Sequence, residues 1–175
     1  MTAKTHLAGG LVAGIAYCGA FSTGIIPVEE PDILGYPICL GLSLLGSIMP
    51  DIDLPTSKAA QAASLSSRII NIFFGHRTLT HSPFIVILMF LAFRTYIPQY
   101  MVLVLAFLVG WSSHILLDAL NKAGVPLFYP YTKRFHLMSI RIRSAGERTL
   151  FVFLLVMSGA VAAFFAAVKI GLIPI

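Results

Sequence analysis

Apolar residues fall into five long runs, separated by short segments that contain prolines or charged residues. The runs cover residues 7–26, 33–49, 83–97, 100–120 and 150–173. A helix needs about 20 apolar residues to cross the hydrocarbon core of a bilayer, so most of these runs approach the length of a membrane span. Only the third run is short for a full crossing. The pattern predicts an all-α fold, an integral membrane bundle of about five transmembrane helices, formed by residues 1–175 as a single domain.

The segment between the second and third runs has the pattern of an amphipathic helix. Within residues 57–74, apolar side chains fall on one helical face and polar ones on another: Leu65, Ile69, Ile72 and Phe73 against Ser64, Arg68 and Asn71. A helix of this kind lies in the membrane interface, with its apolar face toward the lipid. A loop helix that covers the bundle fits the same pattern equally well.

Composition supports the membrane class. The hydrophobic share is 58%, the charged share is 11%, and the mean hydropathy is +0.90, whereas about 25% of residues are charged in an ordinary soluble domain. These values exclude a disordered chain, a collagen-like or coiled-coil rod, and a free cytosolic enzyme. Cys18 and Cys39 lie inside apolar runs without CxxC spacing, so we expect neither a disulfide framework nor a thiolate metal site.

Basic residues indicate the orientation. Ten of the twelve Lys and Arg residues precede the first run or lie between runs two and three or four and five, and only Arg94 and Lys169 lie near the other side. Basic loops stay in the cytoplasm, so we expect a cytoplasmic N-terminus and a periplasmic or extracellular C-terminus. The net charge of +5 thus reports orientation, and without a nucleic-acid-reading motif we expect no nucleic acid partner.

The acids and histidines gather at the predicted cytoplasmic ends of the helices. An antiparallel bundle brings such ends together even when the residues are far apart in sequence. We therefore expect one site with seven candidate metal ligands and two candidate catalytic residues. The candidate ligands are His6, Asp51, Asp53, His76, His81, His114 and Asp118, and the candidate catalytic residues are Arg77 and Glu147.

Two pairs carry most of this expectation. His114 and Asp118 are four residues apart on an otherwise apolar helix, so they share one face. Asp51 and Asp53 follow Pro50, at a helix C-terminus where bare carboxylates are unfavourable and a cation is favoured. For the first pair a hydrogen bond at the helix end is the alternative, and for the second pair Lys58 can supply the cation.

The remaining candidates have weaker signals. Residues 75–83 bring His76, Arg77 and His81 together in a segment that wraps more easily as a loop than as one helix, with Ser82 as the predicted N-cap of the next helix. His6 alone fits an interfacial residue, and His136 fits a surface or headgroup contact. Glu147 fits either a favourable charge at a helix N-terminus or a member of the site.

The donor set predicts the chemistry. Imidazole nitrogens and carboxylate oxygens without thiolates suit a divalent metal, with Zn²⁺ as the first expectation ahead of Mn²⁺ or Mg²⁺, and the number of carboxylates permits one or two ions. Such ions activate water and neutralise oxyanion charge in the hydrolysis of phosphoesters or acyl esters. Arg77 is then placed to clamp a phosphoryl oxygen.

The motifs resemble those of the YdjM-like inner-membrane metal-dependent hydrolase family, from residue 1 to about residue 147. They are His6, the run from Pro50 to Asp53, the blocks 75–77 and 80–82, and the helix with His114 and Asp118 followed by residues 123–127. The resemblance implies a bacterial inner-membrane protein with these His and Asp residues as ligands. The chain departs from the family pattern at Asn121-Lys122, where Thr-Pro is favoured, and in the spacing before Glu147.

The leading hypothesis is a membrane-embedded metallohydrolase whose partner is a membrane lipid or a lipid-linked phosphoester. A fainter similarity to the all-helical zinc phospholipase C group also favours phosphoesters. The alternative is a non-catalytic metal-ion transporter or sensor. A third reading is a structural membrane protein whose basic face binds anionic lipid.

Overall fold

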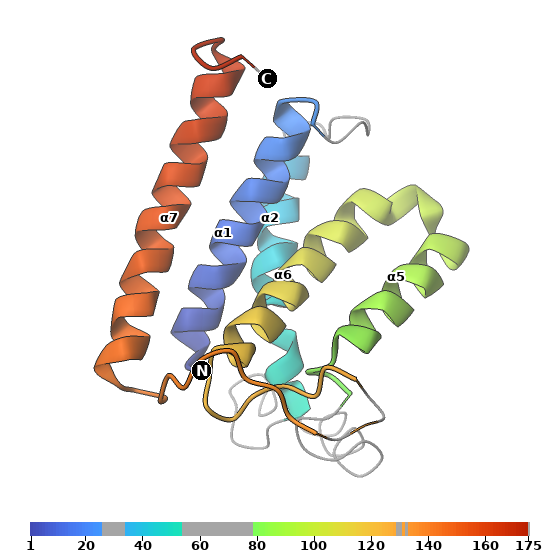
Figure 1. Ribbon diagram of the computed structural model, residues 1–175. Helices are drawn as coiled ribbons and strands as arrows, with labels where there is room; N and C mark the ends of the chain where they lie inside the picture. The colour runs from blue at the N-terminus through green and yellow to red at the C-terminus, as the bar shows by residue number, and fades with distance from the viewer. Residues whose placement is uncertain (26–33, 54–78, 129–130, 132, 175) are drawn as a thin grey trace.

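The computed structural model is a bundle of α-helices, and it describes residues 1–25, 34–53, 79–128, 131 and 133–174 (Figure 1). The helices are α1 (Ala3–Ser22), α2 (Gly35–Gly46), α5 (Pro83–Tyr96), α6 (Met101–Ala119) and α7 (Ala145–Lys169). Two short 3-10 helices, η1 (Met49–Asp53) and η2 (Pro98–Tyr100), follow α2 and precede α6. The predicted all-α class is confirmed for these residues, whose only β pairing consists of two isolated bridges.

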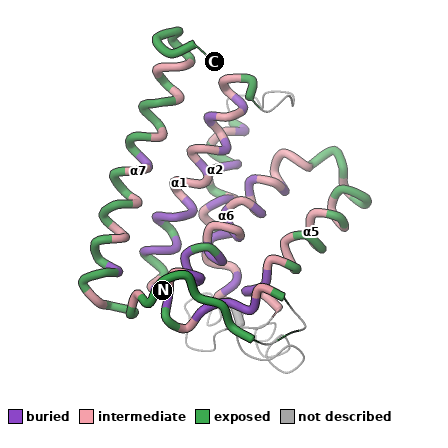
Figure 2. Tube along the Cα trace, viewed as in Figure 1, coloured by how far each residue is buried: buried purple, intermediate pink, exposed green. Residues whose placement is uncertain are grey.

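The contacts between helices place α1 and α6 in the middle of the bundle. Among the described helices, α6 contacts α1, α2 and α5, whereas α7 packs only against α1 and α5 packs only against α6 and its own connection. Figure 2 shows the consequence, with buried residues concentrated on α1 and α6 and mostly exposed residues on α5 and α7. A functional site in this bundle is therefore best protected where α1 and α6 meet.

Helix lengths bear on the predicted five spans. The stretch Pro98–Ala119 and helix α7 are long and apolar enough to cross a membrane by length and composition. At 1.5 Å per residue, the 12 residues of α2 and the 14 of α5 rise only about 18 and 21 Å, less than a hydrocarbon core of about 30 Å. Two candidate spans are thus found in the described part of the chain, and the number five stays a prediction.

The helix bounds differ from the apolar runs for local reasons. α2 ends at Gly46 although the apolar run continues to residue 49, because the N–H of Ile48 bonds to the carbonyl of Leu45, three residues back, and Pro50 has no N–H with which to resume the α-helical pattern. α7 begins five residues before its apolar run, because Ser144 caps it by accepting a hydrogen bond from the N–H of Glu147. The predicted N-cap Ser82 is confirmed, since its side chain accepts from the N–H of Phe84.

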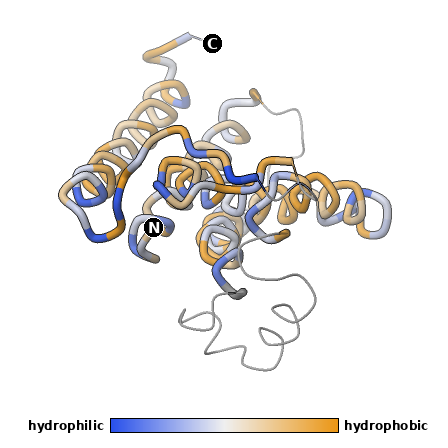
Figure 3. The backbone as a smooth tube through the Cα atoms, turned by 60° about the horizontal axis from the view of Figure 1, so that its bottom comes forward, coloured by the Kyte–Doolittle hydropathy of each residue, from blue (hydrophilic) through white to orange (hydrophobic). Residues whose placement is uncertain are grey.

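One end of the bundle collects the polar residues. The start of α1, the end of α6, η1 and the start of α7 lie at the same end (Figure 1), and Figure 3 shows apolar colours along the helices and hydrophilic colours mainly near the ends and connections. The connection after α6 folds back on this end, where the N–H of Leu137 donates to the carbonyl of Ala119 at 2.7 Å. Val125 in this connection is fully buried against Trp111 and Ile115, which fixes the last turn of α6.

Candidate metal centre

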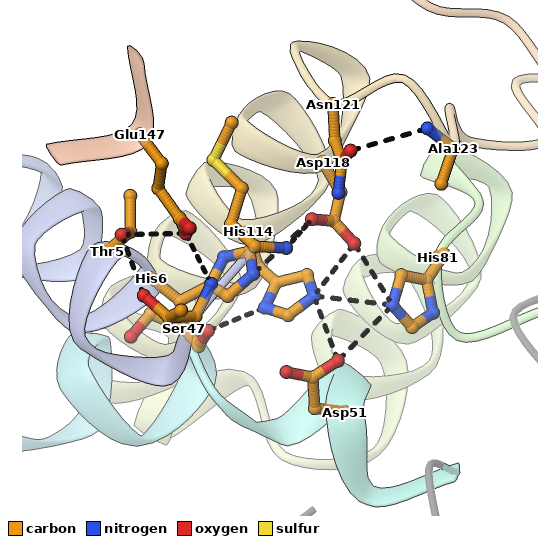
Figure 4. A network of polar contacts seen from close by, with 12 residues as sticks. Thr5, His6, Ser47, Asp51, His81, His114, Asp118, Asn121, Ala123 and Glu147 are labelled. Carbon is orange, nitrogen blue, oxygen red and sulfur yellow. Dashed lines mark hydrogen bonds and ion pairs between the residues drawn. The ribbon is translucent and has the colours of Figure 1, made fainter. Parts of the chain in front are cut away.

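Five of the seven predicted ligands meet at this end of the bundle (Figure 4). His6 comes from the first turns of α1, Asp51 from η1, and His81 from the segment just before α5, while α6 supplies two residues near its end. We refer to His6, Asp51, His81, His114 and Asp118 as the His/Asp cluster. Two groups of three within it, His6 with Asp51 and His114, and His81 with His114 and Asp118, have ligand atoms within 4.8 Å of one another.

His114 lies at the centre of the cluster because it belongs to both groups. Its Nε2 atom is 3.3 Å from Nε2 of His81 and 3.8 Å from the nearest carboxylate oxygens of Asp51 and Asp118. Two ligands that each lie about 2.0–2.1 Å from a tetrahedral Zn²⁺ are themselves about 3.3–3.4 Å apart. The spacing of these atoms therefore fits ligands that share one ion or a close pair of ions.

The tautomer of His114 follows from its second nitrogen. Nδ1 lies 2.7 Å from the backbone carbonyl oxygen of Ser47, and a carbonyl oxygen only accepts hydrogen bonds. Nδ1 therefore carries the proton and donates it to this bond, which leaves the lone pair of neutral Nε2 directed toward the cluster. Metal-bound histidines are commonly oriented by such a bond from the other ring nitrogen.

His6 supplies the second sign of a ligand site. Its side chain is fully buried and stacks on the ring of His114, with 3.7 Å between ring centroids. Nε2 lies 3.4 Å from Oδ1 of Asp118, yet within the part of the chain that the structure describes neither ring nitrogen makes a hydrogen bond. Buried polar atoms are almost always satisfied, so His6 fits a group that coordinates a cation.

His81 is held by its neighbours in sequence and by α6. Nδ1 lies 3.0 Å from the hydroxyl oxygen of Thr80, and the indole N–H of Trp111 donates to the carbonyl of Thr80 at 2.9 Å. Nε2 of His81 is then left on the side of the carboxylates, 3.6 Å from Asp118 and 3.7 Å from Asp51. The segment before α5 is thus fixed with the imidazole facing the cluster.

The two carboxylates differ in their access to solvent. The side chain of Asp118 is 3% exposed and that of Asp51 is 15% exposed, so Asp51 marks the more open side of the cluster. Burial raises the pKa of Asp51, but the hydrogen bond with His81 and the three neighbouring imidazoles together bring it below its ordinary value. Asp118 also accepts a hydrogen bond from the amino group of Met1 at 2.6 Å.

Glu147 lies beside the cluster and binds backbone and hydroxyl groups. Its carboxylate accepts hydrogen bonds from the N–H of Thr2, the hydroxyl of Thr5 and the N–H of Arg143. Thr5 directly precedes His6, so Glu147 ties the start of α7 to the turn that carries a ligand. The structure gives Glu147 a positioning contact, and its predicted catalytic role stays a prediction.

The other predicted site residues lie outside what the structure describes. His76 and Arg77 fall in residues 54–78, as does the predicted interfacial helix, and the side chain of Asp53 is also undescribed although its backbone ends η1. Their roles as ligands and phosphoryl clamp therefore stay predictions. His136 is exposed, consistent with a surface residue.

Three contacts at the site have no clear signal in the sequence. The carbonyl of Ser47 orients His114, the hydroxyl of Thr80 faces His81, and Asn121 lies beside Asp118 (Figure 4). The Asn121 side chain accepts from the N–H of Ala123 through Oδ1, and its buried Nδ2 has no hydrogen-bond partner among the described residues. Of these three residues, only Asn121 stands out in the sequence, because it differs from the residue that the family pattern favours.

The fold and the cluster together define a helical protein with apolar helices and buried His/Asp groups able to hold a metal ion. The family model described as YdjM inner membrane protein matches residues 1–173. The chain belongs to this family, which confirms the resemblance seen in its motifs and makes it a membrane protein. The family description states a location and no reaction.

Individual relatives agree with this assignment. The chain is 33% identical to YvsG of Bacillus subtilis (strain 168) over 137 residues, which cover 78% of each protein. It is 36% identical to the inner membrane protein YdjM of Escherichia coli (strain K12) over 99 residues, or 54% of this chain and 50% of YdjM, and YdjM of Shigella flexneri matches equally. No solved structure matches the chain.

Proposed function

We propose that this protein is a membrane-bound, metal-dependent hydrolase that acts on a lipid or a lipid-linked phosphoester. The single observation that supports it best is the His/Asp cluster, in which three imidazoles and two carboxylates from distant parts of the chain converge with ligand-like spacing. The proposal includes the bacterial inner membrane, a multi-pass bundle of about five spans, and a cytoplasmic position for the N-terminus and the cluster.

The five residues of the cluster would hold the metal, with Zn²⁺ ahead of Mn²⁺ or Mg²⁺. A divalent cation bound there would supply a water of lowered pKa and would neutralise negative charge on a phosphoryl or carbonyl oxygen. The burial of all three imidazoles and of Asp118 keeps bulk water away from the ligands, which strengthens every electrostatic interaction at the site.

The residues of the chain have distinct tasks in this proposal. The carbonyl of Ser47 and the hydroxyl of Thr80 orient the two central imidazoles, and Asp51 lies on the side from which water and substrate enter. Glu147 positions the first turn of α1. Arg77 is proposed to clamp a phosphoryl oxygen.

A metal-ion transporter or sensor is the second candidate, and one observation weighs against transport. Secondary transporters bind their ions near the membrane midplane. In the described helices, the Asp, Glu, Lys, Arg and His residues occur within the first or last two turns of each helix. A pathway of ionisable groups through the middle of the bundle is thus missing from the described helices.

Metal analysis tests the proposal directly. The full chain, purified in detergent, should carry about one or two equivalents of a divalent metal by inductively coupled plasma mass spectrometry. The variants Asp118→Asn and His114→Ala should lose most of it, whereas His136→Ala, which removes an exposed imidazole outside the cluster, should retain it. Wild-type protein should then hydrolyse members of a panel of lipid phosphoesters and acyl esters, lose that activity with a chelator and regain it with metal.

Three results would overturn the proposal. Wild-type protein without metal, or metal that stays bound in both cluster variants, would remove the metal centre. Metal retention without hydrolysis across the panel, together with metal uptake into vesicles, would instead favour the transporter.

A further inference from the structure

A pocket lies beside the His/Asp cluster, between the N-terminal ends of α1 and α7. It has a volume of about 330 Å³, and its lining includes three basic side chains, from Lys4, Arg143 and Arg148. All three residues are exposed, and among the described residues none of them has a carboxylate partner. We refer to this feature as the basic pocket.

The one acidic residue in the lining offsets part of this positive charge, but among the described residues it forms no ion pair with the three cations, and the lining keeps a net positive charge. Glu147 is 3% exposed, and its carboxylate is already occupied by the N–H groups of Thr2 and Arg143 and by the hydroxyl of Thr5. Its negative charge is therefore stabilised by donors that belong to the protein backbone and to one side chain. The three basic groups remain available for an external anion.

Arg143, one of the three basic residues in the lining, has an unusual backbone conformation. Arg143 has φ of 60°, and among the described residues it is the one non-glycine with a left-handed backbone. This conformation is unfavourable for a residue other than glycine. Here it directs the N–H onto Glu147 and leaves the guanidinium in the pocket lining.

The surroundings of the pocket favour an anion that carries an apolar chain. Arg148 also lines a neighbouring pocket of about 440 Å³ together with Val152 and Phe153, both more than half exposed on α7. Only 6% of the apolar window of α7 is buried inside the bundle. An anionic group in the basic pocket would thus lie next to an apolar surface that begins at the same arginine.

We infer that the basic pocket binds the phosphate of an anionic lipid, with the headgroup between the three basic side chains and an acyl chain along the first turns of α7. Arginine and lysine both bind phosphate, and basic residues at a membrane boundary attract anionic lipids. The inference deepens the proposed function, on which its link to a lipid substrate rests. The binding itself requires no metal.

Lipid binding to the detergent-solubilised full chain tests this inference. Native mass spectrometry would compare phosphatidic acid with diacylglycerol of the same chains, so that the two ligands differ only in the phosphate. Phosphatidic acid should bind at least tenfold more tightly than diacylglycerol, both in untreated protein and in protein treated with a chelator.

The pocket is tested with two triple variants that remove the same charge. The pocket variant replaces three lining residues: Lys4→Gln, Arg143→Gln and Arg148→Gln. The control variant replaces three exposed basic residues of the connection after α6: Lys122→Gln, Lys133→Gln and Arg134→Gln. Each basic residue near an anionic lipid contributes roughly fivefold, so the pocket variant should bind phosphatidic acid on the order of a hundredfold more weakly than wild type.

The control variant should bind phosphatidic acid within about threefold of wild type, since it keeps the pocket. Equal losses in the two variants would overturn the inference, because the effect would then come from net charge alone. Equal binding of phosphatidic acid and diacylglycerol would also overturn it.

Competition with inorganic phosphate then shows whether the pocket recognises free phosphate or the whole lipid. Displacement of phosphatidic acid by millimolar phosphate supports a pocket that recognises the phosphate group alone. No displacement supports a lipid that is held by both its headgroup and its acyl chain.

The outcome is separable from that of the proposed function. Metal content of the pocket variant should equal that of wild type, and it also reports that the variant is folded. Loss of lipid binding with metal retained supports the pocket independently of hydrolysis. Metal-free wild-type protein that still prefers phosphatidic acid would refute the metal centre and leave the pocket standing.

Discussion

The contact between α2 and α6 offers a sharp test of how the His/Asp cluster is held. A Cβ atom added at Gly110 of α6 would collide with the backbone of Ser43 in α2, including its carbonyl carbon at 2.7 Å and its Cα at 2.8 Å. Backbone atoms of a packed helix cannot rotate aside, so Gly110→Ala must separate the two helices. The carbonyl of Ser47, one turn beyond Ser43, is the group that orients His114.

The magnitude follows from two opposing effects. Replacing glycine by alanine inside a helix stabilises it by roughly 0.5–1 kcal/mol, whereas overpacking typically costs about 1–3 kcal/mol. Gly41→Ala is the matched control, because a Cβ at Gly41 meets no atom within 4 Å. The gain from alanine is common to both variants and cancels, so Gly110→Ala should be less stable than Gly41→Ala by the overpacking cost, about 1–3 kcal/mol.

Thermal unfolding in detergent measures this difference. For a chain of this size 1 kcal/mol corresponds to about 2–4 °C in Tm, so Gly110→Ala should unfold at least about 2 °C below Gly41→Ala. Metal affinity should fall about 10–100-fold in Gly110→Ala alone, as for other losses of a group that orients a ligand. Equal Tm values for the two variants, or unchanged metal affinity in Gly110→Ala, would refute the reasoning.

Two further substitutions test the contacts around the cluster. Thr80→Val removes the hydroxyl beside Nδ1 of His81 and should weaken metal binding about tenfold in a competitive titration. The control Thr95→Val removes an exposed hydroxyl of α5 and should leave the metal affinity unchanged. Equal metal affinities of the two variants would contradict the role of Thr80. Glu147→Ala leaves the N–H groups of Thr2 and Arg143 without their acceptor and should destabilise the fold by roughly 1–3 kcal/mol or more. Glu147→Gln, which keeps one acceptor oxygen, should lie between wild type and Glu147→Ala in thermal unfolding, and a Tm of Glu147→Ala equal to that of wild type would exclude the positioning contact.

Much of the fold is readable from the sequence because apolar runs and capping residues are local signals. The five runs correspond to the five described α-helices, and Ser82 before Pro83 marks the start of α5 as predicted. Hydropathy misplaces bounds where a helix begins with polar residues, as in α7, or where a proline stops it within an apolar run, as at the end of α2. These features depend on hydrogen bonding, which an average of hydropathy does not contain.

The candidate site, like the fold, is predictable from the sequence only where local signals determine it. The grouping of His6, Asp51, His81, His114 and Asp118 follows from their positions at helix ends together with antiparallel topology. The contact of His114 with Ser47 does not, because every residue has a backbone carbonyl and only the packing of α2 on α6 selects this one. Glu147 illustrates the middle case, since a helix-terminal acid is expected from sequence but its three donors come from two other segments.

The burial of His6 weighs against the reading of this chain as a purely structural membrane protein. A structural role requires only that the ends of α1 and α6 pack well, and a small apolar side chain at this position would satisfy that requirement. The chain instead buries an imidazole completely, and among the described residues its ring nitrogens make no hydrogen bond, whereas an unsatisfied buried polar group costs roughly 1–3 kcal/mol. Its ring stacks on His114, whose neutral Nε2 faces the same carboxylates. Part of this cost is recovered once a cation binds the lone pair of the unprotonated ring nitrogen, because the metal–ligand bond replaces the hydration that this nitrogen loses on burial.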